Sequence, residues 1–589
     1  MATSLIDADS VLAIEIGTVS TRVILFDVVE GRYRFLGQGS VSTTSSAPIN
    51  DVSVGVKAAL DQLHDITGRV LFGANGQMVI PSQPNGLGVD ACVATVSVGA
   101  PLKVVAIGLL EDISAESAKN LASTTYARVV DIMHINDRRG TVERLDTLLQ
   151  LRPDLIVVAG GIEGGAKGSV INLLEAVGLA CYLLPKDERP EVLYAGNSAL
   201  ADQVQSSIGS LANLHVAPNV RQSYESEQLT PSQPALAQIF RQIRSRQLRG
   251  IEDVDLWTGN HSLPAATAFG RTIRFISKES AQTRRGVLGI DVGASATTVA
   301  SAFSGDLILS IYPELGLGEN LPEILDLCPV SDILRWLPVD VAEPDLRNYI
   351  YNKASYPNSL PVTPDELAIE QALACQAIHL AVRQAIKTYP ANVAGSAPGL
   401  LPWFEPIIAS GSVLTKAPTY AQALMMLLNG LQPTGVTTIV LDRNNIAASL
   451  GAAASVAPLL SIHCLEDATN FVNLCTIISA VGKAAPGIPV LRVRMTSENS
   501  PESVLEVKHG SLVAIKLPIG QVGRLHLTPL HRFDVGMEGL GRGGTVKVTG
   551  GALGVIIDAR GRPLRLPAEP ARRRELLKNW LEIASSGGH

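Results

Sequence analysis

Two segments far apart in the chain combine an apolar strand, an acidic residue and a short turn of glycine and hydroxyl residues. The first, residues 11–27, contains Glu15, Gly17, Thr18, Ser20, Thr21 and Arg22. The second, residues 286–303, contains Asp291, Gly293, Ser295 and Thr297. Backbone N–H groups and hydroxyls in such turns can surround phosphate oxygens, and a carboxylate can hold a magnesium ion or its waters. These are the groups that a nucleotide clamp needs.

One hairpin of this kind is weak evidence, because Gly-Thr turns after apolar strands are common structural features. The two segments match in register, however, since Leu12 to Gly17 aligns with Leu288 to Gly293. This match indicates an internal repeat. A third segment, residues 405–418, places Ser410-Gly411-Ser412 directly after an apolar strand, where a backbone without a side chain lets a flat ring or a ribose lie close.

The rest of the chain divides by pattern into further units. From about residue 101 to 220, short apolar runs alternate with helical stretches, which predicts a parallel sheet with crossover helices. Thr363 followed by Pro364 and Glu366 is an N-terminal capping pattern that predicts a long helix over residues 363–389. After about Gly482 the pattern predicts β strands and then a terminal amphipathic helix. We expect domains at 1–80, 81–280, 281–482 and 483–589.

Composition excludes several classes of protein. The 589 residues are 46% hydrophobic and 17% charged, which is typical of a globular chain with several domains. The net charge of −7 argues against a general nucleic-acid surface, although residues 541–589 hold nine Lys and Arg against four Asp and Glu. No apolar stretch reaches the length of a membrane span, and neither a leader pattern nor a CxxC spacing is present. We therefore expect a cytoplasmic protein.

Other candidate sites are better explained as structure. The run GGIEGGAKGS at residues 160–169 follows a strand and opens a helix, so a tight turn and an anion site are equally open readings, but its spacing is not that of a Walker A loop. The glycine-rich run at residues 536–544 reads as a flexible loop. His134 and His379 lack a cysteine or acidic partner at ligand spacing, which favours structural roles for both.

The three glycine-containing elements, in this order, resemble the phosphate-one, phosphate-two and adenosine motifs of the actin/Hsp70/sugar-kinase superfamily. Within it, the chain is most similar to the glutamate mutase L family, the accessory protein encoded beside adenosylcobalamin-dependent glutamate mutase. The similarity covers about residues 10–460 and includes IVVAGGIEGG, VLYAGN, LPAATAFG and RNYIYNKASYPNSLPVTPDELAIEQALA. It implies a duplicated, ribonuclease H-like α/β ATPase core of the actin type, with an inserted parallel α/β domain and a C-terminal β domain.

The resemblance also implies roles for individual residues. Asp291 and Glu15 become the catalytic and magnesium-binding carboxylates, and the nucleotide-binding residues become Gly17, Thr18, Ser20, Thr21, Arg22, Gly293, Ser295, Thr297, Gly411 and Ser412. The chain departs from the family pattern where Glu15 replaces Asp, Arg22 replaces Lys, and Thr298 stands where a closing Asp is usual. These departures put hydrolysis in doubt more than binding.

We therefore expect an ATP- and magnesium-binding, chaperone-like accessory protein with weak or absent ATPase activity. The resemblance implies a protein partner, a cobalamin-dependent mutase. A second reading is a degenerate actin-like scaffold that binds partners without hydrolysis, which the altered Glu15 and Thr298 favour. A small-molecule kinase is a third reading, disfavoured because no clear substrate-base Asp accompanies the adenosine motif.

Overall fold

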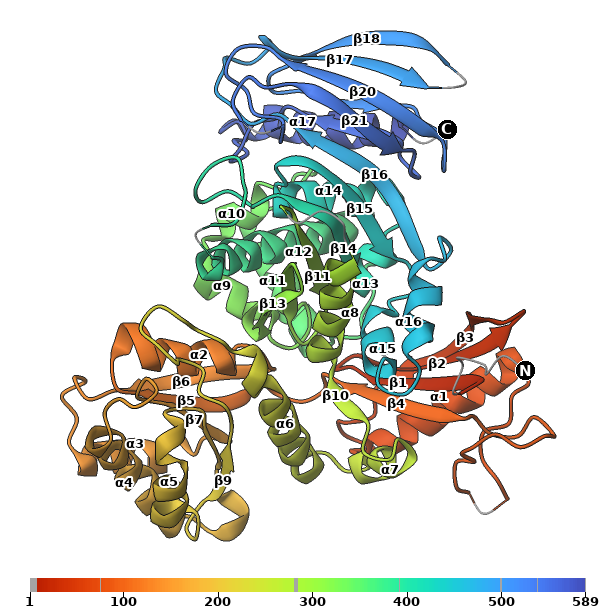
Figure 1. Cartoon of the computed structure of the whole chain (residues 1–589). Helices are drawn as coiled ribbons and strands as arrows, with labels where there is room; N and C mark the ends of the chain where they lie inside the picture. The colour runs from red at the N-terminus through yellow and green to blue at the C-terminus, as the bar shows by residue number, and fades with distance from the viewer. Residues whose placement is uncertain are drawn as a thin grey trace, which may run out of the picture.

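The computed structural model describes residues 8–74, 76–279, 284–390, 392–497, 500–537 and 539–587. Its parts are clearly separated in Figure 1: a first lobe near the N-terminus, an inserted domain beside it, a second lobe in the middle, and a C-terminal β sheet at the far end. Four sheets form the framework of these parts. None of the helices among the described residues is both long and apolar enough to cross a membrane.

The first lobe is built on a five-stranded sheet with the order β10-β4-β1-β2-β3. Strands β1, β2 and β3 are antiparallel neighbours, whereas β4 and β10 run parallel to β1. The bounds are β1 Ser10–Ile16, β2 Ser20–Val29, β3 Arg32–Ser42, β4 Ala91–Val96 and β10 Ser262–Pro264, with helix α1 Val52–Thr67 against β3. Asp51 caps α1 by accepting the Ser53 amide, and Gly68 ends the helix in the left-handed conformation.

The second lobe repeats this arrangement at the start of an eight-stranded sheet, β13-β12-β11-β14-β15-β16-β22-β19. Here again the first three strands are antiparallel, and β14 and β15 follow in parallel on the other side of β11. The bounds are β11 Gly286–Val292, β12 Thr297–Phe303, β13 Asp306–Tyr312, β14 Phe404–Ser410, β15 Gly435–Asp442 and β16 Phe471–Ser479. The shared topology of the two lobes confirms the predicted actin-like α/β core.

Helices cover the second lobe and connect it to the first. Thr363 caps α12 with the predicted capping box, and the helix runs over Pro364–Ala385. The other helices of this region are α9 Ile324–Leu327, α10 Val330–Leu334, α11 Glu343–Ser355, α13 Ser412–Thr415, α14 Tyr420–Leu431, α15 Ala447–Ala453 and α16 Pro458–Leu465. Helix α8, Ala265–Glu279, follows β10 as α15 follows β15, and these two helices pack against each other between the lobes.

The inserted domain is a five-stranded parallel sheet with the order β6-β5-β7-β8-β9, as the alternating pattern predicts. Its elements are β5 Leu102–Gly108, α2 Glu116–Ala122, β6 Ala127–Met133, α3 Thr141–Leu151, β7 Leu155–Ala159, α4 Gly168–Leu183, β8 Glu191–Tyr194, α5 Ala201–Ile208 and β9 Asn213–Val216. The segment 81–280, expected to hold the inserted domain and a connection, also contains β4 and β10, which complete the first lobe's sheet. Helices α6 Gln233–Gln247 and α7 Ile251–Trp257 connect the two.

The C-terminal region divides between two sheets. Strands β17 Pro489–Ser497, β18 Ser500–Lys508, β20 Val522–Pro529 and β21 Gly544–Thr549 form a four-stranded antiparallel sheet. Strands β19 Leu512–Ile515 and β22 Val555–Asp558 instead extend the sheet of the second lobe. The C-terminal β domain expected at 483–589 is therefore not a separate domain, because two of its strands belong to the sheet of the second lobe.

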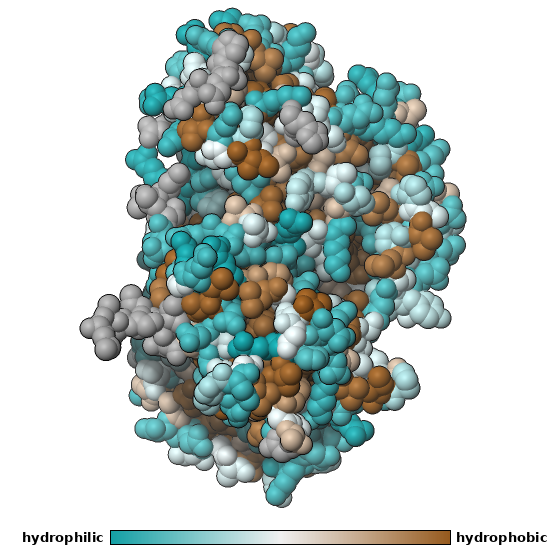
Figure 2. Space-filling view, turned by 90° about the vertical axis from the view of Figure 1, so that its right-hand side faces the viewer, coloured by the Kyte–Doolittle hydropathy of each residue, from teal (hydrophilic) through white to brown (hydrophobic). Residues whose placement is uncertain are grey.

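The terminal helix α17, Pro570–Ser586, packs against α14 of the second lobe and against β19. It buries Leu577, Trp580 and Ala584. Beneath it, the fully buried Asp558 forms ion pairs with Arg560 and Arg562, and the Arg560 guanidinium lies over the Trp580 ring. These contacts place the predicted amphipathic stripe on the body of the protein. On the face that Figure 2 shows, apolar residues lie in separate groups among polar ones.

The crossing of α8 and α15 gives the first testable prediction. A β-carbon added to Gly451 would overlap the backbone carbonyl of Ala268, so Gly451→Ala should force the two helices apart and cost about 1–3 kcal/mol. The variant Gly168→Ala is the control, because nothing lies within 4 Å of the added β-carbon. Differential scanning calorimetry should show a lower melting temperature for Gly451→Ala alone. Equal melting temperatures would contradict the close crossing.

Candidate functional site

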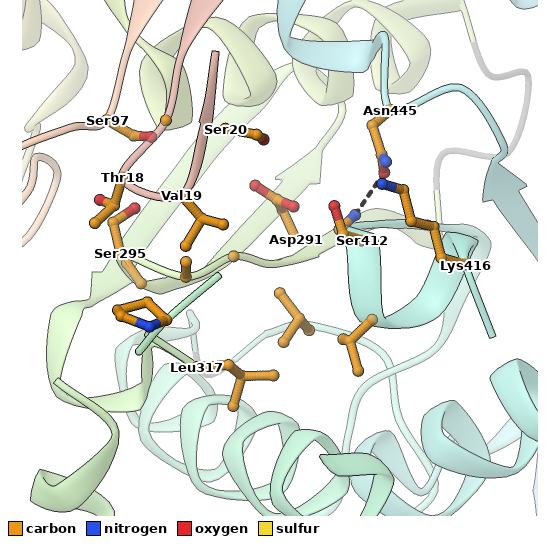
Figure 3. Close-up of a pocket in the computed structure, with 18 of the residues that line it drawn as sticks. Thr18, Val19, Ser20, Ser97, Asp291, Ser295, Leu317, Ser412, Lys416 and Asn445 are labelled. Atoms are coloured by element: carbon orange, nitrogen blue, oxygen red, sulfur yellow. Dashed lines mark hydrogen bonds between the residues drawn. The ribbon is translucent and has the colours of Figure 1, made fainter. Parts of the chain in front are cut away.

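A cavity of about 370 Å³ lies between the two lobes, and all three glycine-containing elements line it. Ten of the twelve predicted site residues line this cavity: Glu15, Gly17, Thr18, Ser20, Arg22, Asp291, Gly293, Ser295, Gly411 and Ser412. Figure 3 shows Thr18 and Ser295 from the two hairpins close together, with Asp291 between them and Ser412. The repeat in the sequence therefore brings the predicted groups to one place.

The other two predicted residues, Thr21 and Thr297, do not line the cavity. Both are fully buried. The Thr21 hydroxyl bonds the Thr43 hydroxyl at 3.0 Å, and the Thr297 hydroxyl donates to the Leu315 carbonyl at 2.8 Å. Each follows its turn and begins the pairing with the first strand, opposite Ile16 or Val292. These two hydroxyls hold the turns in shape.

The two turns have the same backbone geometry. The Gly17 amide donates to the Ser20 carbonyl at 3.0 Å, and the Gly293 amide donates to the Ala296 carbonyl at 3.0 Å. The third loop depends on Gly411, whose φ is +106° and whose added β-carbon would overlap the Val292 carbonyl. Only glycine fits there, because the backbone of one motif lies directly against the backbone of another.

The two carboxylates predicted from the sequence have different surroundings. Glu15 lies across the strand pair from Arg22, forms an ion pair with it, and accepts a hydrogen bond from Ser449 of α15. The Arg22 guanidinium also donates to the backbone carbonyls of Asn444 at 3.1 Å and Asn445 at 2.9 Å. Both oxygens of Glu15 therefore already have partners, and Arg22 joins the first lobe to the second.

Asp291 occupies the matching position in the second hairpin but lies across from Thr298 instead of a cation. Within the described part of the chain, its carboxyl group has no hydrogen-bond partner. Burial above all, together with the charges of Asp442 and Glu15 and against the opposing charge of Arg22, raises the pKa of Asp291 to about 7. Asp291 is thus poised to exchange a proton near neutral pH. Thr298 itself is 1% exposed and does not line the cavity.

Sequence reasoning missed several polar residues of the site. Lys353, Glu370, Lys416 and Asn445 line the cavity, and Asp442 lies behind the loop at Ser410. The fully buried Asp442 accepts the amides of Ile446 and Ala447 and the Ser410 hydroxyl, and burial raises its pKa to about 6. Asn445 accepts the Gly411 amide at 2.9 Å, the bond drawn in Figure 3. The available signal was the acid at the end of the apolar strand TTIVLD, since Glu15 and Asp291 also lie near the ends of apolar strands.

The side chains that line the cavity could hold a magnesium ion only if a bound ligand supplied further oxygen atoms. Among the described residues, no group of three or more His, Cys, Asp or Glu side chains could hold a metal ion. Three of the described carboxylates line the cavity. Glu15 is engaged by Arg22 and Ser449, and Glu370 by Lys353, which leaves Asp291 to accept a bond from a metal-bound water. This arrangement fits magnesium carried mainly by phosphate oxygens and water.

Comparison with known proteins gives a family match over most of the chain. The model of the family described as MutL protein matches residues 11–469. A protein described as "Protein MutL" from Clostridium tetanomorphum is 25% identical over 282 residues, which is 46% of this chain and 58% of that protein. The alignment thus spans little more than half of the relative.

Several solved structures are also similar, at low scores. Component A of (R)-2-hydroxyglutaryl-CoA dehydratase from Acidaminococcus fermentans is 10% identical, with a TM-score of 0.25 over 76% of this chain and 96% of that one. A ROK family glucokinase from Streptomyces griseus, solved with glucose and AMPPNP, is 11% identical, with a TM-score of 0.27 over 76% of this chain and 99% of that one.

The raised pKa of Asp291 predicts a pH-dependent stability. Because the folded pKa of about 7 lies above the ordinary value of 3.8, the neutral carboxyl stabilises the fold fully at low pH, and this contribution is lost as pH rises to about 7. Asp291→Asn should therefore become more stable than the wild type between pH 4 and pH 8, by at least about 1.4 kcal/mol, the value of one pKa unit.

Thermal denaturation of the ligand-free protein across this pH range measures the difference. The control is Asp306→Asn, because Asp306 is exposed at the edge of the same sheet. A constant offset between Asp291→Asn and the wild type at all pH values would show that the Asp291 carboxyl is ionised throughout.

Proposed function

Since the chain belongs to the MutL protein family, we propose that it is an ATP-binding accessory protein that assists a cobalamin-dependent mutase. The observation that carries the nucleotide part is the convergence of two matching hairpins and the Ser410–Ser412 loop on one cavity. The phosphates would lie against the turns at residues 17–20 and 293–296, and the adenosine against Gly411 and Ser412. The partner part rests on family membership.

Magnesium would enter with the phosphates, and Asp291 is the residue that would hold one of its waters. The ion would neutralise phosphate charge and orient the terminal phosphate. Its positive charge would also favour the ionised form of Asp291, whose pKa is otherwise raised by burial and by neighbouring carboxylates. Binding of the metal–nucleotide complex is therefore coupled to release of a proton from this site.

Hydrolysis would be slow for a reason visible in the first hairpin. The Glu15 carboxylate is held by Arg22 and Ser449, so it is not free to position water or metal. Loss of such a preorganised group removes stabilisation of charge that develops in the transition state. Nucleotide exchange and slow turnover then suit a protein that changes shape on binding more than one that consumes ATP rapidly.

The inserted domain provides a route from the cavity to a partner. Its Tyr126 lines the cavity, and Ser123 accepts a hydrogen bond from the Ile311 amide of β13 at 2.9 Å. Arg128 at the start of β6 forms an ion pair with Glu323 of the second lobe. A change in the angle between the lobes would move these contacts, so nucleotide binding would reposition the inserted domain.

The second candidate function is a scaffold of actin type that binds partners without hydrolysis. The observation that favours it is the engaged state of Glu15, together with the absence of a cation across from Asp291 at Thr298. It differs from the first proposal in whether the nucleotide is consumed.

Isothermal titration with ATP, with and without magnesium, tests nucleotide binding. We expect binding at micromolar to millimolar concentration, and we expect Asp291→Ala to lose the part of the affinity that depends on magnesium. Asp306→Ala should bind like the wild type, because Asp306 is exposed on β13 away from the cavity lining. Absence of heat for the wild type with millimolar Mg-ATP would reject the nucleotide-clamp proposal.

Measurement of phosphate release tests turnover. We expect the wild type to hydrolyse ATP well below roughly 1 per second, the low end of ordinary enzyme turnover. Addition of the partner mutase should raise the rate if the lobes act on the partner, and should leave it unchanged for a scaffold. Rapid turnover by the isolated protein would contradict both candidate functions, the slow ATPase and the scaffold without hydrolysis.

A further inference from the structure

The cavity also reaches the end of β4 in the first lobe, on the side of Asp291 away from the adenosine loop. This end is lined by Thr95 and Ser97 at the end of β4 and by Tyr126 of the inserted domain. In Figure 3, Ser97 and Thr18 lie on the opposite side of Asp291 from Ser412 and Lys416. The nucleotide proposed above would reach this end with its phosphates, because Ser97 lies beside the Gly17 turn, whereas its adenosine would lie at the other end.

The internal repeat makes this end the counterpart of the adenosine loop. Thr95 is paired with Glu15 between β4 and β1, as Ser410 is paired with Asp291 between β14 and β11. Counting two residues on from each pair, Ser97 corresponds to Ser412. The fold therefore builds two equivalent strand ends that open into one cavity, and the adenosine of a single nucleotide accounts for one of them.

Hydroxyl groups at this end are placed for a ligand. Thr95 is 2% exposed and lines the cavity, and its buried hydroxyl oxygen has no hydrogen-bond partner among the residues that the structure describes. Beside it, the Tyr126 hydroxyl bonds the Ser97 side chain and the backbone of Ala266 at the start of α8. A buried hydroxyl without a partner is unusual in native proteins, and a ligand oxygen would satisfy it.

The charges and apolar groups around this end indicate the class of ligand. Glu15 and Asp291 lie next to it, and the nearby cation Arg22 is already paired with Glu15. An additional anion would be repelled there. Apolar residues of the cavity as a whole, among them Phe269, Leu317 and Leu321, offer apolar contact. The combination suits a small uncharged molecule with both carbon and oxygen atoms.

We propose that the Thr95–Ser97–Tyr126 end of the cavity binds a second ligand, a small neutral molecule carrying hydroxyl or carbonyl oxygens, beside the nucleotide. The position of this ligand beside a nucleotide rests on the proposed function, whereas the hydroxyl groups that would bind the ligand do not depend on it. Tyr126 makes the inserted domain part of this second site. A ligand bound there would contact the inserted domain through Tyr126, and this domain contacts both lobes.

A matched pair of engineered cysteines tests the proposal on the full chain. Ser97→Cys and Ser412→Cys occupy equivalent positions in the repeat, and the six native cysteines are all buried, so background labelling is low. The rate of modification by methyl methanethiosulfonate, followed by mass spectrometry, reports whether each end is covered. The probes are Mg-ATP and glycerol, a small neutral polyol.

We expect Mg-ATP to slow labelling of Ser412→Cys at least tenfold and that of Ser97→Cys less, because only the phosphates would reach Ser97. We expect glycerol to slow Ser97→Cys at least threefold and to leave Ser412→Cys unchanged. Adding Thr95→Val, which keeps the shape and removes the hydroxyl, should abolish glycerol protection of Ser97→Cys.

Three outcomes would decide against parts of this scheme. Equal protection of both cysteines by Mg-ATP would assign the whole cavity to the nucleotide and overturn the second site. Absence of glycerol protection at Ser97→Cys, or protection that survives Thr95→Val, would overturn it as well. Protection of neither cysteine by Mg-ATP would reject the nucleotide proposal, whereas glycerol protection that depends on Thr95 would still support the second site.

Discussion

The close crossing of α8 and α15 is the contact on which the geometry of the cleft depends. Gly451 lets the two backbones meet without an intervening side chain. The Thr272 hydroxyl of α8 donates to the Ala447 carbonyl of α15 at 2.7 Å and holds the crossing in register. Since α15 begins just after β15, this crossing also fixes the turn at Asp442–Asn445 against the first lobe. Ser449 then reaches Glu15, and the carbonyls of Asn444 and Asn445 reach Arg22.

That network explains why two matching hairpins carry carboxylates of different character. In the first hairpin, the cross-strand cation Arg22 and Ser449 of helix α15 each engage one carboxylate oxygen of Glu15. In the second, Thr298 offers no charge across from Asp291, and the buried Asp442 lies near enough to raise its pKa. A pair of acids with environments this different is suited to separate tasks. One holds the lobes together, and the other is free to respond to a ligand.

The sequence was informative where chemistry is local and repeated. Three local features could be predicted from the sequence: the hairpins, the Gly411 loop and the cap at Thr363. Each is a short pattern in which the residue types determine the local backbone conformation. The domain limits could not, because β4 and β10 reach the first sheet from either side of the inserted domain, and β10 has only three residues. Likewise, β19 and β22 resemble neighbouring strands in sequence, and long-range pairing alone assigns them to the second lobe. Asp442 was missed because its role depends on Ser410 and on the turn that follows it.

The inserted domain is held in place by its contacts with the two lobes. One face of its sheet shares a continuous apolar core with the first lobe through Leu236, Phe240 and Ile243 of α6. The same apolar cluster also includes Leu309 and Ile311 of β13 in the second lobe. Ser123 also bonds Ile311, and Arg128 forms an ion pair with Glu323. Apolar cores resist deformation, whereas exposed ion pairs contribute little and exchange readily. The inserted domain therefore packs on the first lobe through α6 and contacts the second lobe at β13 and Glu323, and Tyr126 joins it to the wall of the cavity.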